Sequence, residues 1–237
     1  MAPIQDSMTP PYAGTLSASD RISAFLSSVY AWMGTGLAIT AAVAWLVSSS
    51  PQLTVAIAQN RFLFWGLMIA QLGIVFTLSA RVQKLAPATA SMLFIGYSAL
   101  TGVTLSFLLL VFTGESIATT LFITAGMFGA LAAWGTLTKR DLTGFGQFLF
   151  MGLIGVVLAS LVGIFWQNST FQFVLSFIGV IVFTGLAAYD AQRLKAMALA
   201  VPDAQIGSYA VVGALSLYLD FINLFMMLLR FTGSRRE

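Results

Sequence analysis

The sequence predicts an all-α membrane protein with seven transmembrane helices. Of its 237 residues, 59% are hydrophobic and only 8% are charged, whereas about 25% of the residues of an ordinary soluble domain are charged. At about 20 residues a span, this length holds roughly six to eight helices and leaves no room for a soluble module. We therefore expect a single transmembrane domain at 25–230, between a polar tail at 1–24 and a short basic tail at 231–237.

Seven apolar segments, each bounded by polar or charged residues, are long enough to cross a bilayer. In chain order they are 25–47, 62–80, 88–112, 117–137, 145–166, 171–189 and 206–230. Their ends are marked, in the same order, by SSSP at 48–51, by Arg81 and Lys84, by Gly114 and Glu115, by KRD at 139–141, by the turn QNST at 167–170, by Asp190, Arg193 and Lys195 ahead of a polar turn at Pro202 and Asp203, and by RRE at 235–237. A weakly apolar connector with Gln59, Asn60 and Arg61 joins the first two segments.

The distribution of Lys and Arg predicts a cytoplasmic N-terminus, because short loops rich in these residues stay in the cytoplasm. The basic residues then inside are Arg21, Arg81, Lys84, Lys139, Arg140, Arg193 and Lys195, and those outside are Arg61, Arg230, Arg235 and Arg236. If the last segment instead entered the membrane and returned to the same side, the C-terminal tail would be cytoplasmic, and only Arg61 would then oppose the distribution expected of basic residues. Residues 215–229 contain no Gly or Pro to break a helix, however, so we retain seven spans.

The chain contains no cysteine and no histidine. This excludes disulfides, zinc sites built on these residues, Cys or His nucleophiles and imidazole proton relays. We expect no cofactor, and titration near neutral pH must come from carboxyl groups. The net charge of +3 lies in loops and at the tail, where it bears on topology, and we expect no nucleic-acid partner. The tail 1–24 lacks a basic region followed by a short apolar core, so we interpret it as a retained tail rather than a signal peptide.

One acid lies at mid-depth in the last apolar segment. Residues 206–230 span roughly 37 Å as a helix, more than the roughly 30 Å hydrocarbon core, so Asp220 lies near the middle. A carboxylate there costs at least about 2.5–3.5 kcal/mol, so it should face a partner, the bundle interior or a water-filled path. Small and polar residues recur on its helix face, at Tyr209, Gly213, Ser216, Asp220, Asn223 and Met227. We expect the other helices to wrap this one.

Asp190 has two interpretations. It forms a local ion pair with Arg193 one turn later, or it meets Asp220 on the antiparallel last helix as a carboxyl pair. A residue count places Asp190 near the inner membrane boundary, with Asp220 about 15 Å deeper. The pair can therefore form only if the helix continues past Asp190 into KAMALAV at 195–201, a stretch rich in good helix formers.

Three strings resemble the Bax inhibitor-1 (transmembrane Bax inhibitor motif) family, in its bacterial inner-membrane branch. They are GALSLYLDFINLFMMLLRFTG at 213–233, IVFTGLAAYDAQRLK at 181–195 and TKRDLTGFGQFLFMGLIG at 138–155. The resemblance implies two layers of three helices around a central C-terminal helix, in a multi-pass protein of the cell inner membrane. It also implies a pH-sensitive calcium leak in which Asp190 and Asp220 form the sensor and Arg81 is a latch on them. Many members carry a glutamate where this chain has Gln71, which removes one charge from the ion path.

The chemistry of two adjacent carboxyl groups is consistent with this role. In a poorly hydrated site both cannot ionise cheaply, so they share one proton. At lower pH the shared proton bridges the last two helices, and its loss leaves two like charges that repel. Ca²⁺ takes six to eight oxygens, so two carboxylates with Asn223, carbonyls and water give a weak, transient site. Ser216 and Gln71 complete the candidate ion path.

Other functions remain open at this stage. A non-conducting regulator would bind membrane proteins such as a quality-control protease, with the N-terminal tail as its contact. A proton-coupled transporter would also use an acid at mid-membrane. Tyr189-Asp190 matches the first motif of intramembrane aspartyl proteases, but Asp220 follows Leu-Tyr-Leu rather than Gly-x-Gly and no Pro-Ala-Leu follows it. We therefore expect no enzyme. The expected partners are membrane lipid, Ca²⁺ and H⁺.

Overall fold

The computed structural model describes residues 17–166 and 168–236. In this part of the chain all regular structure is helical, which confirms the all-α prediction. The α-helices are α1 (Ala18–Ser48), α2 (Pro51–Gln59), α3 (Arg61–Arg81), α4 (Pro87–Val111), α5 (Gly114–Leu137), α6 (Thr143–Phe165), α7 (Ser169–Ala200) and α8 (Ile206–Thr232), with short 3-10 turns η1 (Val82–Lys84) and η2 (Asp203–Gln205). Among the described residues, 7 helices are long and apolar enough to cross a membrane, as predicted, and only α2 is too short.

Helix α1 and the connector after it differ from the segments predicted for them. Helix α1 begins at Ala18, ahead of the predicted span at 25–47, because Ser17 accepts the backbone N–H of Asp20 and caps a polar first turn. The connector between the first two spans contains α2, which Pro51 starts at a position where a helix needs no N–H donor. Residues 1–16, Gln167 and Glu237, which belong to the predicted tails and turn, lie outside the described residues.

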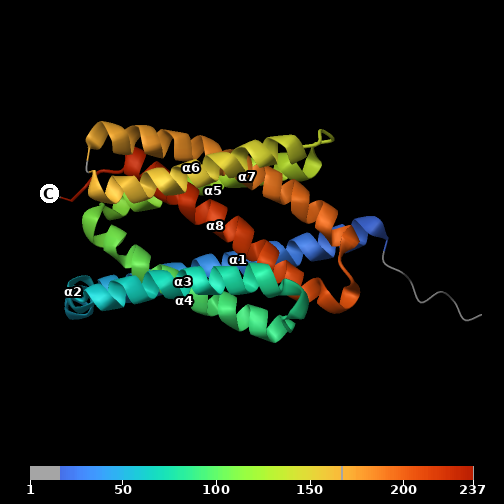
Figure 1. Ribbon diagram of the computed structural model, residues 1–237, viewed down its shortest axis with the longest axis horizontal. Coiled ribbons are helices and arrows are strands. Elements are labelled where there is room, and N and C mark those ends of the chain that lie inside the picture. Colours follow the sequence, from blue (N-terminus) through green and yellow to red (C-terminus); the bar gives the residue numbers. More distant parts are fainter. Residues whose placement is uncertain (1–16, 167, 237) are drawn as a thin grey trace, which may run out of the picture.

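Helix α8 is the most enclosed of the spanning helices. The buried share of its most apolar stretch is 72%, whereas the next highest share, in α7, is 44%. Helix α4 packs against α1 and α3, helix α7 packs against α5, α6 and α1, and α8 crosses the middle of the bundle (Figure 1). It contacts α1, α3, α4, α5 and α7. A helix so enclosed has room for polar side chains that lipid would not tolerate.

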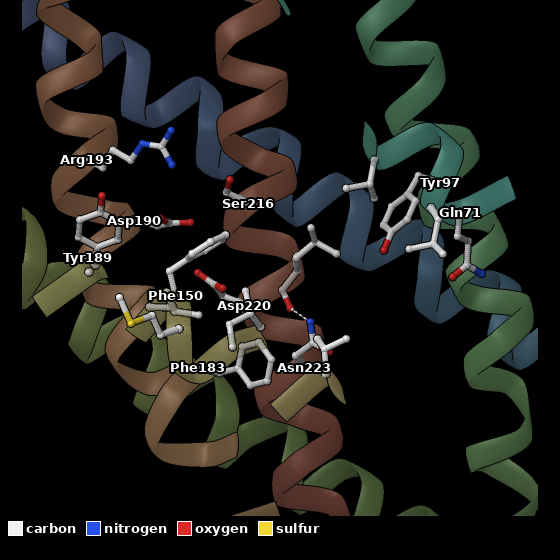
Figure 2. Close-up of a pocket in the computed structure, with 18 of the residues that line it drawn as sticks. Gln71, Tyr97, Phe150, Phe183, Tyr189, Asp190, Arg193, Ser216, Asp220 and Asn223 are labelled. Carbon is white, nitrogen blue, oxygen red and sulfur yellow. Dashed lines mark hydrogen bonds between the residues drawn. The ribbon is translucent and has the colours of Figure 1, made fainter. Parts of the chain in front are cut away.

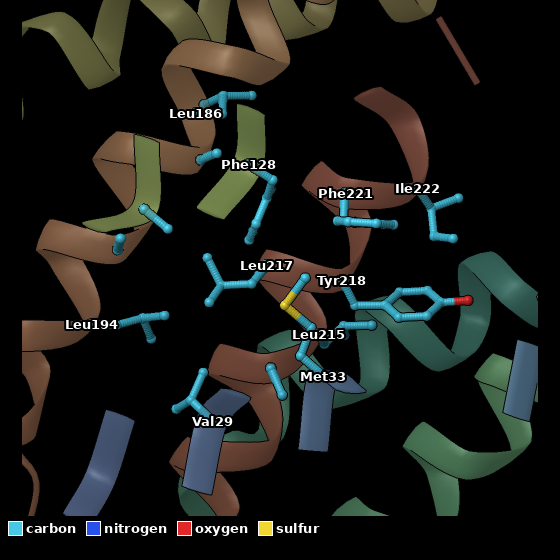
Figure 3. Close-up of a cluster of buried hydrophobic side chains, with 14 of the residues drawn as sticks. Val29, Met33, Phe128, Leu186, Leu194, Leu215, Leu217, Tyr218, Phe221 and Ile222 are labelled. Atoms are coloured by element: carbon cyan, nitrogen blue, oxygen red, sulfur yellow. The ribbon is translucent and has the colours of Figure 1, made fainter. Parts of the chain in front are cut away.

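The hydrophobic core is built around α8. Figure 3 shows Leu217 and Tyr218 on opposite sides of α8, with labelled side chains of α1, α5 and α7 gathered around this helix. Tyr218 is fully buried, and its hydroxyl shares a 2.6 Å hydrogen bond with the hydroxyl of Thr40 on α1. The rings of Phe94 and Tyr97 on α4 meet the Tyr218 ring edge-on. One side chain thus joins α8 to both α1 and α4.

Helix α7 is held closely against α5 and α6 just before Asp190. A Cβ on Gly135 of α5 would overlap the carbonyl oxygen of Ala188, and a Cβ on Gly146 of α6 would overlap the Tyr189 ring. Glycine is required at 135, because the overlap there is with backbone, whereas a side chain at 146 would displace the Tyr189 ring. The two contacts fix the part of α7 that carries Asp190.

The loop between α7 and α8 is tied to the start of α1 by Arg21. Its Nε donates to the Ala198 carbonyl at 2.8 Å, another of its N–H groups donates to the Val201 carbonyl, and its guanidinium pairs with Asp203 at 2.8 Å. This is the one ion pair in the described part of the chain. The carbonyls at the end of α7, which have no partner within the helix, are satisfied in this way.

Outside the spans, hydrogen bonds from Thr143 hold the pKa of Asp141 below its ordinary value where α6 begins.

We predict that Gly135→Ala destabilises the protein by about 1–3 kcal/mol, because the added methyl group pushes α5 off the α7 backbone. Thermal unfolding of the detergent-solubilised protein measures this change. The control is Gly129→Ala on the same helix, where an added Cβ meets nothing within 4 Å. That substitution should leave stability unchanged or raise it by up to about 1 kcal/mol. Equal stability of the two variants would contradict the close α5–α7 approach.

Candidate functional site

A cavity of about 840 Å³ lies between α3 and α4 on one side and α6, α7 and α8 on the other. Its wall is largely apolar, with Phe150 of α6 and Phe183 of α7 among the lining residues (Figure 2). The polar and charged side chains that line it are Gln71, Tyr97, Thr104, Gln147, Tyr189, Asp190, Arg193, Ser216, Asp220 and Asn223. All five predicted sensor and path residues, Asp190, Asp220, Asn223, Ser216 and Gln71, therefore line this cavity.

Asp220 is buried at the middle of α8. It is 7% exposed, and its Oδ2 atom has no hydrogen-bond partner among the described residues. A buried carboxyl oxygen without a donor is costly in either protonation state, and most costly when the group is charged. Such a group is retained where it has a function or a partner that comes and goes. Asp220 is thus the strongest functional candidate in the cavity.

Asp190 faces the same space from α7. Figure 2 shows both carboxyl groups turned into the gap between α7 and α8, and the charge of Asp190 acts on Asp220. No hydrogen bond joins the two carboxyls in the described structure, and the Oδ2 atom of Asp220 has no partner there. Arg193 also lines the cavity and its charge acts on Asp190, but the described residues contain no ion pair between them. The geometry brings together the two acids that the sequence singled out.

The length of α7 makes this meeting geometrically feasible. The helix runs through Asp190 to Ala200, as the carboxyl-pair interpretation required. Arg193 is exposed, and the Lys195 ammonium donates to the Thr136 carbonyl at the end of α5 at 2.8 Å. The Lys195 ammonium is thus bonded at a helix end, as long basic side chains are near a membrane surface, whereas Arg193 is exposed at the edge of the cavity that it lines.

Amide oxygens add to the donor set of the cavity. The Asn223 Nδ2 donates to the Leu219 carbonyl at 2.8 Å, and the Gln71 Nε2 donates to the Thr104 hydroxyl at 2.7 Å. With each NH₂ group bonded to protein, both side-chain carbonyl oxygens remain available to a cation, beside the Ser216 hydroxyl and two carboxyls. Hard cations such as Ca²⁺ bind oxygen ligands of this kind. Within the described residues no group of three or more acids gathers, so the set suits weak binding.

Arg81 lies apart from this cavity. It ends α3, is exposed, forms no ion pair among the described residues and does not line the space between the two acids. Its role as a latch stays a prediction. Sequence reasoning missed Tyr97 and Thr104, although polar residues recur on that face of α4 at Tyr97, Thr101 and Thr104, at helical spacing.

Comparison with known proteins places relatives of this chain in several bacteria. A family model described as inhibitor of apoptosis-promoting Bax1 matches residues 22–237. The chain is 48% identical to inner membrane protein YbhL of Escherichia coli over 99% of this chain and 98% of the relative. It is 44% identical to an uncharacterized protein of Borreliella burgdorferi, over 90% of this chain and 93% of that protein. An uncharacterized protein of Deinococcus radiodurans is 41% identical over 91% of this chain and 93% of its own length.

We predict that Asp220→Asn stabilises the protein at about pH 8 by about 1–3 kcal/mol, because a charged carboxylate buried near Asp190 is replaced by a neutral amide. At about pH 5, where the acid site carries a proton, the gain should shrink. Thermal unfolding at the two pH values measures it. Asp20→Asn, which neutralises an exposed acid in the first turn of α1, is the matched control and should show no such gain. A stability loss at both pH values would mean that Asp220 has a partner that the cavity does not reveal.

Proposed function

Because the chain belongs to the Bax inhibitor-1 family, we propose that it is a pH-sensitive calcium leak gated by Asp190 and Asp220. The observation that carries the proposal is the state of Asp220: a buried carboxyl without a hydrogen-bond partner, lining a cavity together with a second acid. We extend to this chain the inner-membrane location that the name of the E. coli relative states. The seven apolar helices are consistent with that location.

The gate follows from the charges of the two acids. At lower pH one proton is shared between Asp190 and Asp220, and it draws α7 and α8 together. At higher pH the proton is lost and two like charges face each other in an apolar cavity, where their repulsion is strong. Separation of the helices, or entry of a cation between the carboxylates, relieves it. The leak is therefore closed by acid and opened as pH rises.

Calcium is the permeant ion that fits the donors. The cavity offers oxygens from the two acids, from Ser216 and Asn223 on α8, and from Gln71 on α3. A Ca²⁺ ion would complete its six to eight ligands with water, and it would leave readily because the ligands are few and spread over several helices. Gln71 supplies an oxygen without a charge, which lowers the affinity further and favours passage over retention.

Arg81 belongs to the proposal as a latch that reaches the acids in another state. Its helix, α3, has the smallest buried share of the spanning helices in the described chain, 6%. Movement of α3 therefore breaks few packing contacts. In that state the guanidinium of Arg81 would replace the cation beside the ionised pair.

We predict that the purified protein in liposomes passes Ca²⁺ several-fold faster at about pH 8 than at about pH 5, because deprotonation opens the gate. Asp220→Asn should abolish this pH response, whereas Asp20→Asn should keep it. A Ca²⁺-sensitive dye inside the liposomes measures the initial rate. The same pH response in wild type and Asp220→Asn would remove the gate, and no flux at any pH would favour the non-conducting regulator.

We also predict that Gln71→Glu raises the affinity of the path for Ca²⁺, because it adds a carboxylate to the oxygen-lined cavity. The Ca²⁺ concentration that gives half-maximal flux should fall several-fold. Gln59→Glu, at the end of α2 and outside the cavity, is the control and should leave it unchanged. If Ca²⁺ flux depends on Ca²⁺ concentration in the same way in both variants, the ion does not pass Gln71.

A further inference from the structure

A second polar cavity lies at the opposite end of α8 from its first turn. Its volume is about 650 Å³, and it is formed where α7 begins, α8 ends and the C-terminal residues return along the loop between α4 and α5. Figure 1 shows the C-terminal end of the chain beside the start of α7. The charged residues that line this cavity are Arg230 and Arg235, and its polar residues include Ser169 and Ser176.

Among the described residues, those that line the cavity carry positive charge and no negative charge. No acid lines it, and neither arginine forms an ion pair within the described residues. Glu115 follows the lining residue Phe112 by three positions in the sequence, but it lines a separate pocket with Thr232 and Ser234. The first N–H groups of the 32-residue helix α7 also point toward this end, where the helix dipole favours an anion. Two exposed arginines and the first turn of α7, where Asn168 already accepts the N–H of Phe171, thus line one space.

The site is held in place by backbone pairing. Arg235 forms an isolated antiparallel bridge with Phe112, the N–H of Arg236 donates to the Val111 carbonyl at 2.9 Å, and the N–H of Thr113 donates to the Ser234 carbonyl at 3.1 Å. Arg235 is therefore fixed at the cavity although it lies in the tail. Ser176 is 1% exposed and lines the cavity, so its wall holds a buried hydroxyl group.

The position of the cavity identifies the kind of anion. Arg230 lies in the last turn of a membrane-spanning helix, and aromatic side chains surround this end of the bundle. Phe165 is 90% exposed and Trp166 is 59% exposed, both where α6 ends, and Phe173 of α7 stacks near Phe231 of α8. Exposed aromatic rings at the ends of membrane spans mark the headgroup level of the bilayer. An anion bound there has lipid chains as its neighbours.

We propose that this cavity binds the phosphate of an anionic phospholipid headgroup, with the acyl chains lying along the exposed apolar faces of α6 and α7. Arginine suits this role because its planar fork bonds phosphate oxygens in pairs, and basic pockets between membrane helices bind anionic headgroups. The Ser176 hydroxyl donates a further hydrogen bond from the buried wall. This lipid site is separate from the cavity of Asp190 and Asp220 and does not depend on the proposed leak.

Lipid binding to the full-length protein tests the site. The detergent-solubilised protein is titrated with dioleoylphosphatidylglycerol, or with zwitterionic dioleoylphosphatidylcholine, and native mass spectrometry counts the lipids retained. Wild type should bind the phosphatidylglycerol in preference. The double variant Arg230→Gln/Arg235→Gln should bind it roughly thirty-fold more weakly, at about a factor of five for each arginine. Ser176→Ala, which removes a single hydroxyl, should weaken it a few-fold.

A double control variant matches the loss of charge. Arg61→Gln/Arg236→Gln removes two arginines from the same end of the bundle without touching the cavity lining, and should keep the wild-type preference. Equal weakening of phosphatidylglycerol binding in both double variants would overturn the site, because general surface charge would then account for the binding. Displacement of the lipid by equimolar inorganic phosphate would also overturn it, since the cavity would then hold a free anion. Unchanged thermal unfolding of each variant shows that the fold is intact.

Discussion

A carboxyl group at the middle of a membrane-spanning helix has to be kept away from lipid, and the arrangement of this protein follows from that constraint. Asp220 is 7% exposed because α8 is enclosed by its contacts with α1, α3, α4, α5 and α7. The same enclosure leaves Oδ2 without a donor and places Asp190 of α7 across the cavity. Enclosure protects the acid from lipid while leaving it in one cavity with a second acid, and the proposed response to protons and cations rests on that conflict.

Much of the fold could be predicted from the sequence because the lipid environment simplifies the pattern. Long apolar segments are helices there, since only a helix satisfies its own backbone within a bilayer, and all seven were found. The failures have local causes. Helix α1 begins among polar residues ahead of its apolar segment, where hydropathy does not indicate a helix. Helix α2 is too short and too weakly apolar for a hydropathy pattern to distinguish it from a loop. Short helices of this kind depend on their neighbours rather than on their own sequence.

The candidate site was predicted less completely, because it depends on helices that are distant in the sequence. The two acids could be singled out from the rarity of charge in apolar segments. Their shared cavity depends on contacts such as that of Gly135 with Ala188, and a single sequence gives no sign of which glycine meets which helix. The position of Arg81, exposed and outside the cavity, is likewise set by where α3 ends. Thr104 and Tyr97 follow a polar face of α4 whose orientation only the packing fixes.

The central claim is that Asp190 and Asp220 hold one proton between them, and infrared difference spectroscopy in lipid bilayers tests it most directly. The C=O stretch of a protonated carboxyl group reports the shared proton as pH is stepped. We expect a band that disappears as pH rises, that is absent in Asp220→Asn, and whose midpoint pH changes in Asp190→Asn because the like charge beside Asp220 is gone. The same midpoint in wild type and Asp190→Asn would show that the two acids titrate independently, and would contradict the shared proton.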